Sequence, residues 1–304
     1  MSSTQAELNS NILILDRKLL GQREYWTNRL SYEREESHLV PDHPRPARYV
    51  AHNACFTFDV SGSLYQQLKK LTGNGPFLMY TALLVALKIT LHKYTGSRWI
   101  LVGSPSLKET ENATPSRNAL AIVDEISSGL SFRELLLNVR QNLLEAYARQ
   151  QYPYERLLTD LNLDNVPNRG ALFDITLLLR EIHNPPAETK EDLTIYLERM
   201  SDHLHGCVEF SPQLYDRETI QRFCEHWLNL LGNALAASDL KIGELNIISP
   251  PEREQVLFAW NNTDWAGPAG NCFHELFEEQ AKTTPDAPAL VDSRTQITYS
   301  ELNK

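Results

Sequence analysis

Two of the nine histidines stand at a spacing that suits metal binding. His203 and His205 are separated by one residue, so on a β-strand both side chains point to the same face of the sheet. A zinc site needs three or four protein ligands, and no third ligand is evident for this pair. We therefore interpret both residues as ordinary strand histidines and predict no metal site.

Ser104 is the second side chain that we weighed for chemistry, because it follows a predicted strand in Gly103-Ser104-Pro105. A serine nucleophile needs a paired base and backbone amides that hold an oxyanion. The sequence shows no base paired with Ser104, Pro105 has no amide hydrogen, and the pattern differs from the Gly-x-Ser-x-Gly elbow. We expect no catalytic residue in this chain.

The four cysteines are far apart in the sequence and make no Cys-x-x-Cys pair. They are Cys55, Cys207, Cys224 and Cys272. This spacing predicts neither a zinc ribbon nor a disulfide framework. Reduced thiols are the expectation for a cytosolic protein.

Composition restricts the class of protein. The 304 residues suffice for one large domain, or for one domain and the start of another. The net charge of -10 argues against a nucleic-acid partner, because binding to nucleic acid rests on clustered Lys and Arg. The amino terminus lacks the basic start and apolar run of a secretion signal, and Asn11 to Leu15 is too short to cross a bilayer. We expect a cytoplasmic protein without a membrane partner.

Hydrophobic spacing predicts helices interleaved with strands along most of the chain. The helix from Pro76 to Gly96 is apolar on nearly all sides and should be buried. Ser131 and Glu134 have the spacing of a capping box, which predicts a helix start. Further helices are predicted at 19–30, 61–73 and 216–234, the last two with Ser61 and Asp216 as N-caps. Strands are predicted at 56–60, 99–102, 119–123, 173–180, 193–198, 204–210 and 242–248. This alternation favours helices packed on a sheet, an α/β fold.

Two stretches in the middle of the chain carry a family resemblance. Residues 148–158 read Ala-Arg-Gln-Gln-Tyr-Pro-Tyr-Glu-Arg-Leu-Leu, and residues 168–174 read Asn-Arg-Gly-Ala-Leu-Phe-Asp. Together they resemble the late motifs of condensation domains from non-ribosomal peptide synthetases. The similarity extends from about Leu19 to Ile248 and implies the carboxy-terminal lobe of such a domain. The fold implied is a two-layer α/β sandwich like that of chloramphenicol acetyltransferase.

We interpret the residues of these motifs as structural. Tyr152 to Glu155 should form an aromatic turn that anchors two helices, and Arg169 should tie loop carbonyls together rather than touch a substrate. The family-motif residues are Tyr152, Pro153, Tyr154, Glu155, Asn168, Arg169, Leu172 and Phe173.

The sequence also departs from the family. Condensation domains use a His-His-x-x-x-Asp-Gly signature upstream of these motifs, and this chain has no two adjacent histidines. The resemblance implies that such a histidine helps an acceptor amine to attack a donor thioester, with both substrates tethered to carrier proteins. Residues 116–122 and 168–173 differ from the usual family strings as well, which suggests relaxed demands on the substrate tunnel.

The last part of the chain resembles the opening of an adenylation domain, which activates an amino acid with ATP. The linker is assigned to Trp260, Asn261, Asn262 and Thr263, and segments 273–280, 284–286, 289–291 and 298–302 carry the rest of the resemblance. The phosphate-binding loop of that family is absent. We therefore expect no cofactor on this chain, while the resemblance implies ATP, Mg and phosphopantetheine for the parent synthetase. We predict a tail at 1–18, a condensation-type lobe at 19–250, a helix and linker at 251–271 and an incomplete adenylation domain at 272–304.

Three functions are compatible with these features. The first is a catalytically inactive platform that holds the adjoining adenylation domain in a synthetase. The second is a half-domain that completes an amide-forming site with a separate amino-terminal lobe, acting on carrier proteins. The third is a binding module that recruits an auxiliary protein. A lobe that normally packs on a sibling exposes an apolar face when it is alone, so a stable platform requires that this face be polar or covered.

Overall fold

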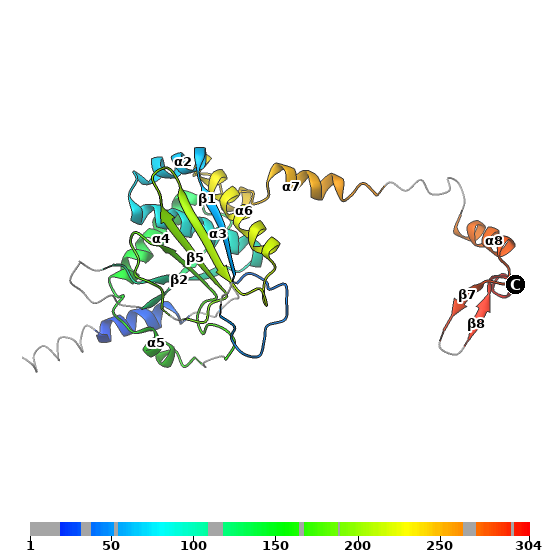
Figure 1. The fold of residues 1–304 in the computed structure, drawn as a ribbon, viewed down its shortest axis with the longest axis horizontal. Coiled ribbons are helices and arrows are strands. Elements are labelled where there is room, and N and C mark those ends of the chain that lie inside the picture. Colours follow the sequence, from blue (N-terminus) through cyan, green and yellow to red (C-terminus); the bar gives the residue numbers. More distant parts are fainter. Residues whose placement is uncertain are drawn as a thin grey trace, which may run out of the picture. The chain divides into compact units, whose positions relative to one another are not determined.

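The computed structural model of the protein describes residues 19–31, 38–51, 54–108, 118–163, 167–187, 189–263, 272–292 and 295–304. The chain divides into two compact units, Met1–Ser249 and Pro250–Lys304 (Figure 1). The predicted tail at 1–18 and residues 264–271 of the predicted linker lie outside the described residues.

Helix α3 (Pro76–Thr95) is the centre of the first unit and is buried along most of its length, as predicted. Pro76 occupies its first position, where a missing amide hydrogen leaves no bond unmade. Gly96 ends it in the left-handed conformation, with a φ of 73°. Because apolar residues lie on all sides, neighbours must cover every face of this helix. Those neighbours are the sheet and three helices, α2 (Gly62–Thr72), α4 (Phe132–Tyr147) and α6 (Arg217–Ala236).

Six strands form one mixed sheet in the order β1-β6-β5-β4-β2-β3. They are β1 (Ala54–Val60), β2 (Trp99–Pro105), β3 (Ala119–Glu125), β4 (Ile175–Leu179), β5 (Leu193–Arg199) and β6 (Leu204–Phe210). β4 pairs in parallel with β2 and β5, and the remaining pairs are antiparallel. The predicted α/β fold is confirmed, and these six strands differ from the prediction only at their ends.

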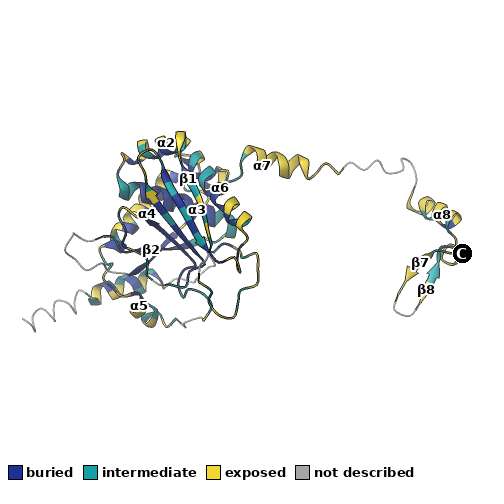
Figure 2. Cartoon of the chain, viewed as in Figure 1, coloured by how far each residue is buried: buried dark blue, intermediate teal, exposed yellow. Residues whose placement is uncertain are grey.

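The two faces of this sheet differ. The helices pack behind one face (Figure 1), and the strands there are largely buried (Figure 2). Leu204 and Val208, at alternate positions of β6, are buried. Thr194 is buried at one of the alternating positions of the β1, β5 and β6 half, but most of these positions are at least partly exposed and several are polar. They include Thr57, Asp59, Glu198, His205 and Glu209. The face that carries no helix therefore presents several polar side chains over this half, together with Tyr196, Cys55 and Cys207.

Capping at the helix ends is confirmed at one of three predicted positions. At α4 the hydroxyl of Ser131 accepts from the amide of Glu134, and the Glu134 carboxylate accepts from the amide of Ser131 at 2.7 Å. Ser61 and Asp216 occupy the corresponding positions of α2 and α6, but their side chains make no cap hydrogen bond. Asp216 instead lies 2.9 Å from the ring of His43.

The predicted strand at 242–248 is wrong. Residues Ile242–Glu244 form a 3₁₀ turn. Its amides bond to the loop before α4, where Ile242 donates to the carbonyl of Leu130 and Gly243 to that of Ser128. The buried residues here, Ile242 and Leu245, are three positions apart, and this spacing suits a turn of helix rather than a strand.

The second unit contains short elements. Helix α7 (Pro250–Glu254) continues as a π-helical turn over Gln255–Ala259, followed by α8 (Phe273–Thr283), β7 (Pro288–Val291), β8 (Gln296–Thr298) and α9 (Tyr299–Leu302). Among its described residues only Ala281 is buried, and the side chain of Phe273 is 86% exposed. This unit therefore has very little core.

In the part of the chain that the structure describes, no single helix has both the length and the apolar character of a membrane span. α2 and α3 meet those criteria only as a pair, across a bend of 118°.

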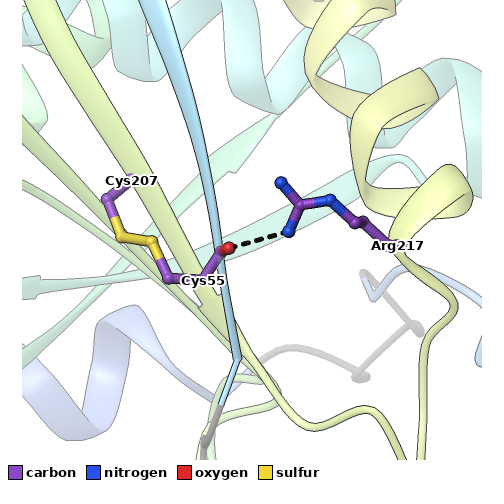
Figure 3. The surroundings of a disulfide bond; sticks show 3 residues. All are labelled: Cys55, Cys207 and Arg217. Atoms are coloured by element: carbon purple, nitrogen blue, oxygen red, sulfur yellow. Dashed lines mark hydrogen bonds between the residues drawn. A yellow bond between two sulfur atoms is a disulfide. The ribbon is translucent and has the colours of Figure 1, made fainter.

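A disulfide bond joins Cys55 on β1 to Cys207 on β6 (Figure 3). Cys224 and Cys272 are free, whereas the bond corrects the expectation of reduced thiols at Cys55 and Cys207. Antiparallel pairing of β1 with β6 brings the two residues together, because Cys207 lies opposite Thr57, two residues from Cys55. Arg217 donates to the carbonyl of Cys55 at 3.1 Å. The bond and this contact hold an edge strand to the sheet and to the start of α6.

Replacing Cys55 by Ser should lower the free energy of unfolding by about 2–4 kcal/mol in non-reducing buffer, because the disulfide restricts the unfolded chain. Urea unfolding with and without a reductant measures this difference, and non-reducing peptide mapping should find the two cysteines linked. Cys272→Ser, at an exposed free cysteine, is the matched control and should change neither result. Free thiols at Cys55 and Cys207 after purification without reductant would contradict the bond.

Candidate functional site

The first family motif forms the junction between α4 and α5 (Tyr154–Asp160). Pro153 is the residue that precedes the first turn of α5. The side-chain amide of Asn118 donates to the carbonyls of Gln150 and Tyr152, at 2.8 and 2.7 Å. Its oxygen accepts from the amide of Tyr154 at 2.9 Å. Asn118 thus fixes the junction from the start of β3, a role that the sequence analysis missed.

The other side chains of this motif pack or pair with protein atoms. The hydroxyl of Tyr152 donates to the carboxylate of Asp160, and this bond lowers the pKa of Asp160. Tyr154 is buried, with its ring 5.7 Å from that of Phe173 between centroids. Glu155 is exposed. The aromatic residues therefore join α5 to the second motif.

In the second motif, Arg169 forms an ion pair with Asp174, with Nε 3.1 Å from the carboxylate. We predicted that Arg169 binds loop carbonyls, but its observed partner is the carboxylate of Asp174. Asn168 donates to the carbonyl of Pro46 at 2.8 Å. Leu172 and Phe173 are buried.

Phe173 lies against β2 at Gly103. A Cβ atom at Gly103 would be 2.4 Å from the Phe173 ring, so only glycine leaves room for the ring there. The second motif is in this way attached to the sheet.

A buried ion pair connects the second motif to the segment before β1. Arg45 donates from both terminal nitrogens to the carboxylate of Asp192, at 2.6 and 2.5 Å, and also reaches the carbonyl of Asn168 at 3.3 Å. Asp192 is 1% exposed, and two-pronged Arg–carboxylate pairs are among the strongest polar contacts. Burial beside it raises the pKa of Glu191. The motif residues thus belong to a network that closes one end of the sheet.

The cavity next to these motifs is too small for a substrate. It measures about 80 Å³ and is bordered by residues of both motifs, including Tyr154, Glu155 and Arg169. Small-molecule sites typically enclose about 300–1,000 Å³. The structure therefore brings the predicted motif residues together without forming a substrate pocket between them.

Ser104 does have a histidine neighbour, which the sequence did not reveal. Its hydroxyl lies 3.4 Å from Nε2 of His183 and bonds to the hydroxyls of Tyr80 and Tyr147, at 2.9 and 2.8 Å. All four side chains are buried. The cluster links α3, α4, β2 and the connection after β4.

Hydrogen bonding excludes His183 as a base for Ser104. The amide of Leu179 donates to Nδ1 of His183 at 3.0 Å, so the ring proton is on Nε2, the nitrogen that bonds Tyr147 at 2.7 Å. A base would need a free lone pair on Nε2. Burial also lowers the pKa of His183 to about 3, which keeps the ring neutral. The cluster is a structural network.

His203 and His205 point to one side, as predicted, and meet Asp59 on β1. Nδ1 of His205 lies 2.8 Å from the Asp59 carboxylate, and Nε2 of His203 lies 3.8 Å from it. His203 also contacts Asp202 at 2.8 Å. The described residues contain no group of three or more His, Cys, Asp or Glu arranged to hold a metal ion.

A buried lysine lies in the otherwise apolar α3. Lys88 is 0% exposed, and its ammonium donates to the carbonyls of Ile100 and Ile122 and to the carboxylate of Asp124, at 3.1, 2.6 and 2.6 Å. All three donor hydrogens are therefore used. Burial lowers the pKa of Lys88, and the charge of Asp124 opposes that shift. Lys88 attaches α3 to both β2 and β3.

Lys88→Met should destabilise the first unit by about 3–5 kcal/mol, because it leaves the buried Asp124 carboxylate with only the more distant guanidinium of Arg29, at 4.0 Å, as a cation. Adding Asp124→Leu should recover part of this loss. Urea unfolding followed by tryptophan fluorescence measures both effects, with Lys70→Met on the exposed side of α2 as the control. A single variant as stable as the parent would exclude a structural role for this pair.

Acid should destabilise the fold through His183. The pKa is about 3 in the folded state and about 6.5 in the unfolded chain, so the neutral ring stabilises the fold above pH 6.5 and this contribution disappears as the pH falls toward 3. From pH 7 to pH 5 the loss should be about 2 kcal/mol. Urea unfolding at both pH values should show this loss to be smaller in His183→Gln than in the exposed-site control His43→Gln. Equal losses of stability in the two variants would refute the assignment of this pH dependence to His183.

Comparison with known proteins agrees with this architecture. The protein-family model described as the condensation domain matches residues 13–257. Gramicidin S synthase 2 of Aneurinibacillus migulanus is 32% identical over 303 residues, which is 93% of this chain and 7% of that protein. Bacitracin synthase 1 of Bacillus licheniformis is 30% identical over 94% of this chain and 6% of its own length. The chain thus spans a small part of these curated relatives.

Solved structures share the fold at lower identity. The four-domain non-ribosomal peptide synthetase holo-AB3403, bound to AMP and glycine, has a TM-score of 0.76 and 18% identity, covering 92% of this chain and 24% of that one. The X-domain from teicoplanin biosynthesis in complex with OxyB has a TM-score of 0.68 and 17% identity, covering 79% of this chain and 59% of that one. By the family match and the identity to its relatives, this chain belongs to the condensation domain family.

Proposed function

We propose that this chain is part of a non-ribosomal peptide synthetase, in which it is a catalytically inactive condensation-type lobe that supports an adjoining adenylation domain. One observation carries the proposal. The chain belongs to the condensation family, and its 304 residues contain no His-His-x-x-x-Asp-Gly signature. General base catalysis needs a basic side chain within hydrogen-bond reach of the attacking amine.

The extent of the structural matches supports a single lobe. The starter condensation domain of rhizomide synthetase aligns with 77% of this chain but only 56% of its own, with a TM-score of 0.64. The alignment with the teicoplanin X-domain is also partial and covers 79% of this chain and 59% of that one. At this low identity the likeness concerns the fold alone. It fits the carboxy-terminal lobe that the family motifs indicate.

The contacts of the motif residues support a structural role. Arg169 is paired with Asp174, Tyr152 with Asp160, and Asn168 with a backbone carbonyl. The serine and histidine that approach each other, Ser104 and His183, are buried and have the wrong tautomer for base catalysis. These groups therefore stabilise the lobe rather than act on a substrate.

The polarity of the open sheet face favours a platform over a half-domain that awaits a second lobe. The face carries Thr57, Asp59, Glu198, His205 and Glu209 at partly or fully exposed positions. Permanent interfaces between subunits are apolar at their centre and depleted in charged residues. The polar side chains on this face support a lobe that needs no partner there.

The adjoining adenylation domain is proposed from the sequence of residues 272–304. This segment has one buried residue, Ala281, among those described, and Phe273, Val291 and Leu290 are exposed. Apolar side chains of this kind need further chain or a partner to cover them. ATP, Mg and phosphopantetheine are accordingly assigned to the parent synthetase and not to this chain.

Loaded carrier proteins provide the test of inactivity. We expect the 304-residue chain to form no amide from a donor thioester and an acceptor amine, with an intact condensation domain as the positive control. Adding a separate amino-terminal lobe that carries the histidine signature should not restore product, because the open face is polar. Product from the chain alone would disprove inactivity, and product only in the mixture would establish the half-domain.

A further inference from the structure

The first unit contains a second, larger cavity away from the family motifs. It encloses about 470 Å³ beyond the end of β4, which is within the range of small-molecule sites. It is bordered by Lys108, Leu178, Arg180, His183, Asn184, Pro185, Pro186 and Tyr196. No Asp or Glu is among the described residues that line it.

The walls of this cavity suit an apolar group. Leu178 and Tyr196 lie opposite each other on β4 and β5, and Pro185 and Pro186 come from the connection that follows β4. Proline and aromatic rings present apolar surface with little side-chain freedom to lose on binding. This part of the cavity is therefore suited to the flat or aliphatic body of a ligand.

The floor of the cavity is rigid. His183 lines the cavity and is held by the amide of Leu179 and the hydroxyl of Tyr147. The side chain of Asn184 donates to the carbonyl of Leu107 at 3.0 Å and to the hydroxyl of Ser106 at 3.1 Å. The site is consequently formed before any ligand arrives, which reduces the entropy lost on binding.

One cation at this site has no carboxylate partner in the cavity wall. Lys108 donates from its ammonium to the carbonyl of Arg180 at 2.7 Å, which leaves two donor hydrogens for another group. Its charge is close enough to His183 to contribute to the lowered pKa of that ring. In a chain with a net charge of -10, this ammonium is a local positive site at the edge of an apolar cavity.

The second cation of the cavity wall, Arg180, already has a carboxylate partner in Glu198. Nε of Arg180 lies 3.7 Å from the carboxylate of Glu198, and its guanidinium is 5.5 Å from the centre of the Tyr196 ring. Among the described residues that line the cavity, Lys108 is therefore the cation without a carboxylate partner. A singly charged carboxylate matches it better than a phosphate, which needs several charge-assisted donors.

We propose that this cavity binds a small carboxylic acid with an apolar body, with the carboxylate at Lys108 and the body against Leu178, Pro185, Pro186 and Tyr196. This site is independent of the platform role. It gives the lobe a ligand that neither the family motifs nor the absent histidine signature would involve.

Binding of hydrocinnamate to the full chain tests the site, with the neutral hydrocinnamide as the matched probe. Ligand-observed NMR titration should show saturable binding of both, and the acid should bind about threefold to tenfold more tightly at low salt. High salt should reduce this preference, because it screens a partly exposed charge pair.

Two variants localise the effect. Lys108→Gln should remove the preference for the acid and leave the affinity for the amide unchanged, whereas Lys70→Gln on α2 should behave like the parent. Tyr196→Ala should weaken both probes alike, and its thermal unfolding midpoint reports whether the lobe is still folded. Equal affinities for acid and amide in the parent, an unchanged preference in Lys108→Gln, or no saturable binding of either probe would overturn the proposal.

Discussion

Burial of α3 from Met79 to Leu91 is the constraint on which the first unit depends. A helix that is apolar on all sides cannot face water, so the sheet, α2, α4 and α6 must enclose it. Apolar contacts have no preferred direction and do not determine which side of the helix meets the sheet. Two polar side chains of α3 determine which side meets the sheet. Tyr80 reaches Ser104 and the carbonyl of Leu177, and Lys88 reaches two strand carbonyls and Asp124.

Ion pairs in and next to the family motifs stabilise the end of the sheet where β4 and β5 begin. Arg45 with Asp192 and Arg169 with Asp174 join the segment before β1 to the chain that leads into β4 and β5. Burying such charges is costly unless each is paired. Here each guanidinium donates two hydrogen bonds to its carboxylate. Residues that mark the family in sequence thus make contacts that stabilise the lobe.

The two faces of the sheet separate the roles of the lobe. One face carries the helices and the core, and the other has several polar, partly exposed side chains over the β1, β5 and β6 half. The edge strand β1 is further held by the Cys55–Cys207 bond. A polar open face and a secured edge both reduce unwanted association of an exposed sheet. These features agree with a lobe that works as a scaffold and keeps a separate pocket available for a small ligand.

Local chemistry predicted much of the fold. Pro76, Gly96 and the Ser131–Glu134 pair mark helix ends because their effects depend on residues within one turn. The same reasoning failed at 242–248, where apolar residues with a spacing of three were assigned to a strand. It also failed for the N-caps at Ser61 and Asp216, whose side chains make no cap bond.

The amino-acid sequence by itself determined the α/β class, the order of the main helices and strands, the condensation-family motifs and the absence of the histidine signature. Tertiary structure alone decided the Cys55–Cys207 bond, the hydrogen bonds of Asn118 to the α4–α5 junction, the tautomer of His183 and the position of Lys108 beside its cavity. The partners in these contacts are mostly far apart along the chain. Strand pairing and helix packing bring them together, and a local pattern of residues contains no information about which distant groups will meet.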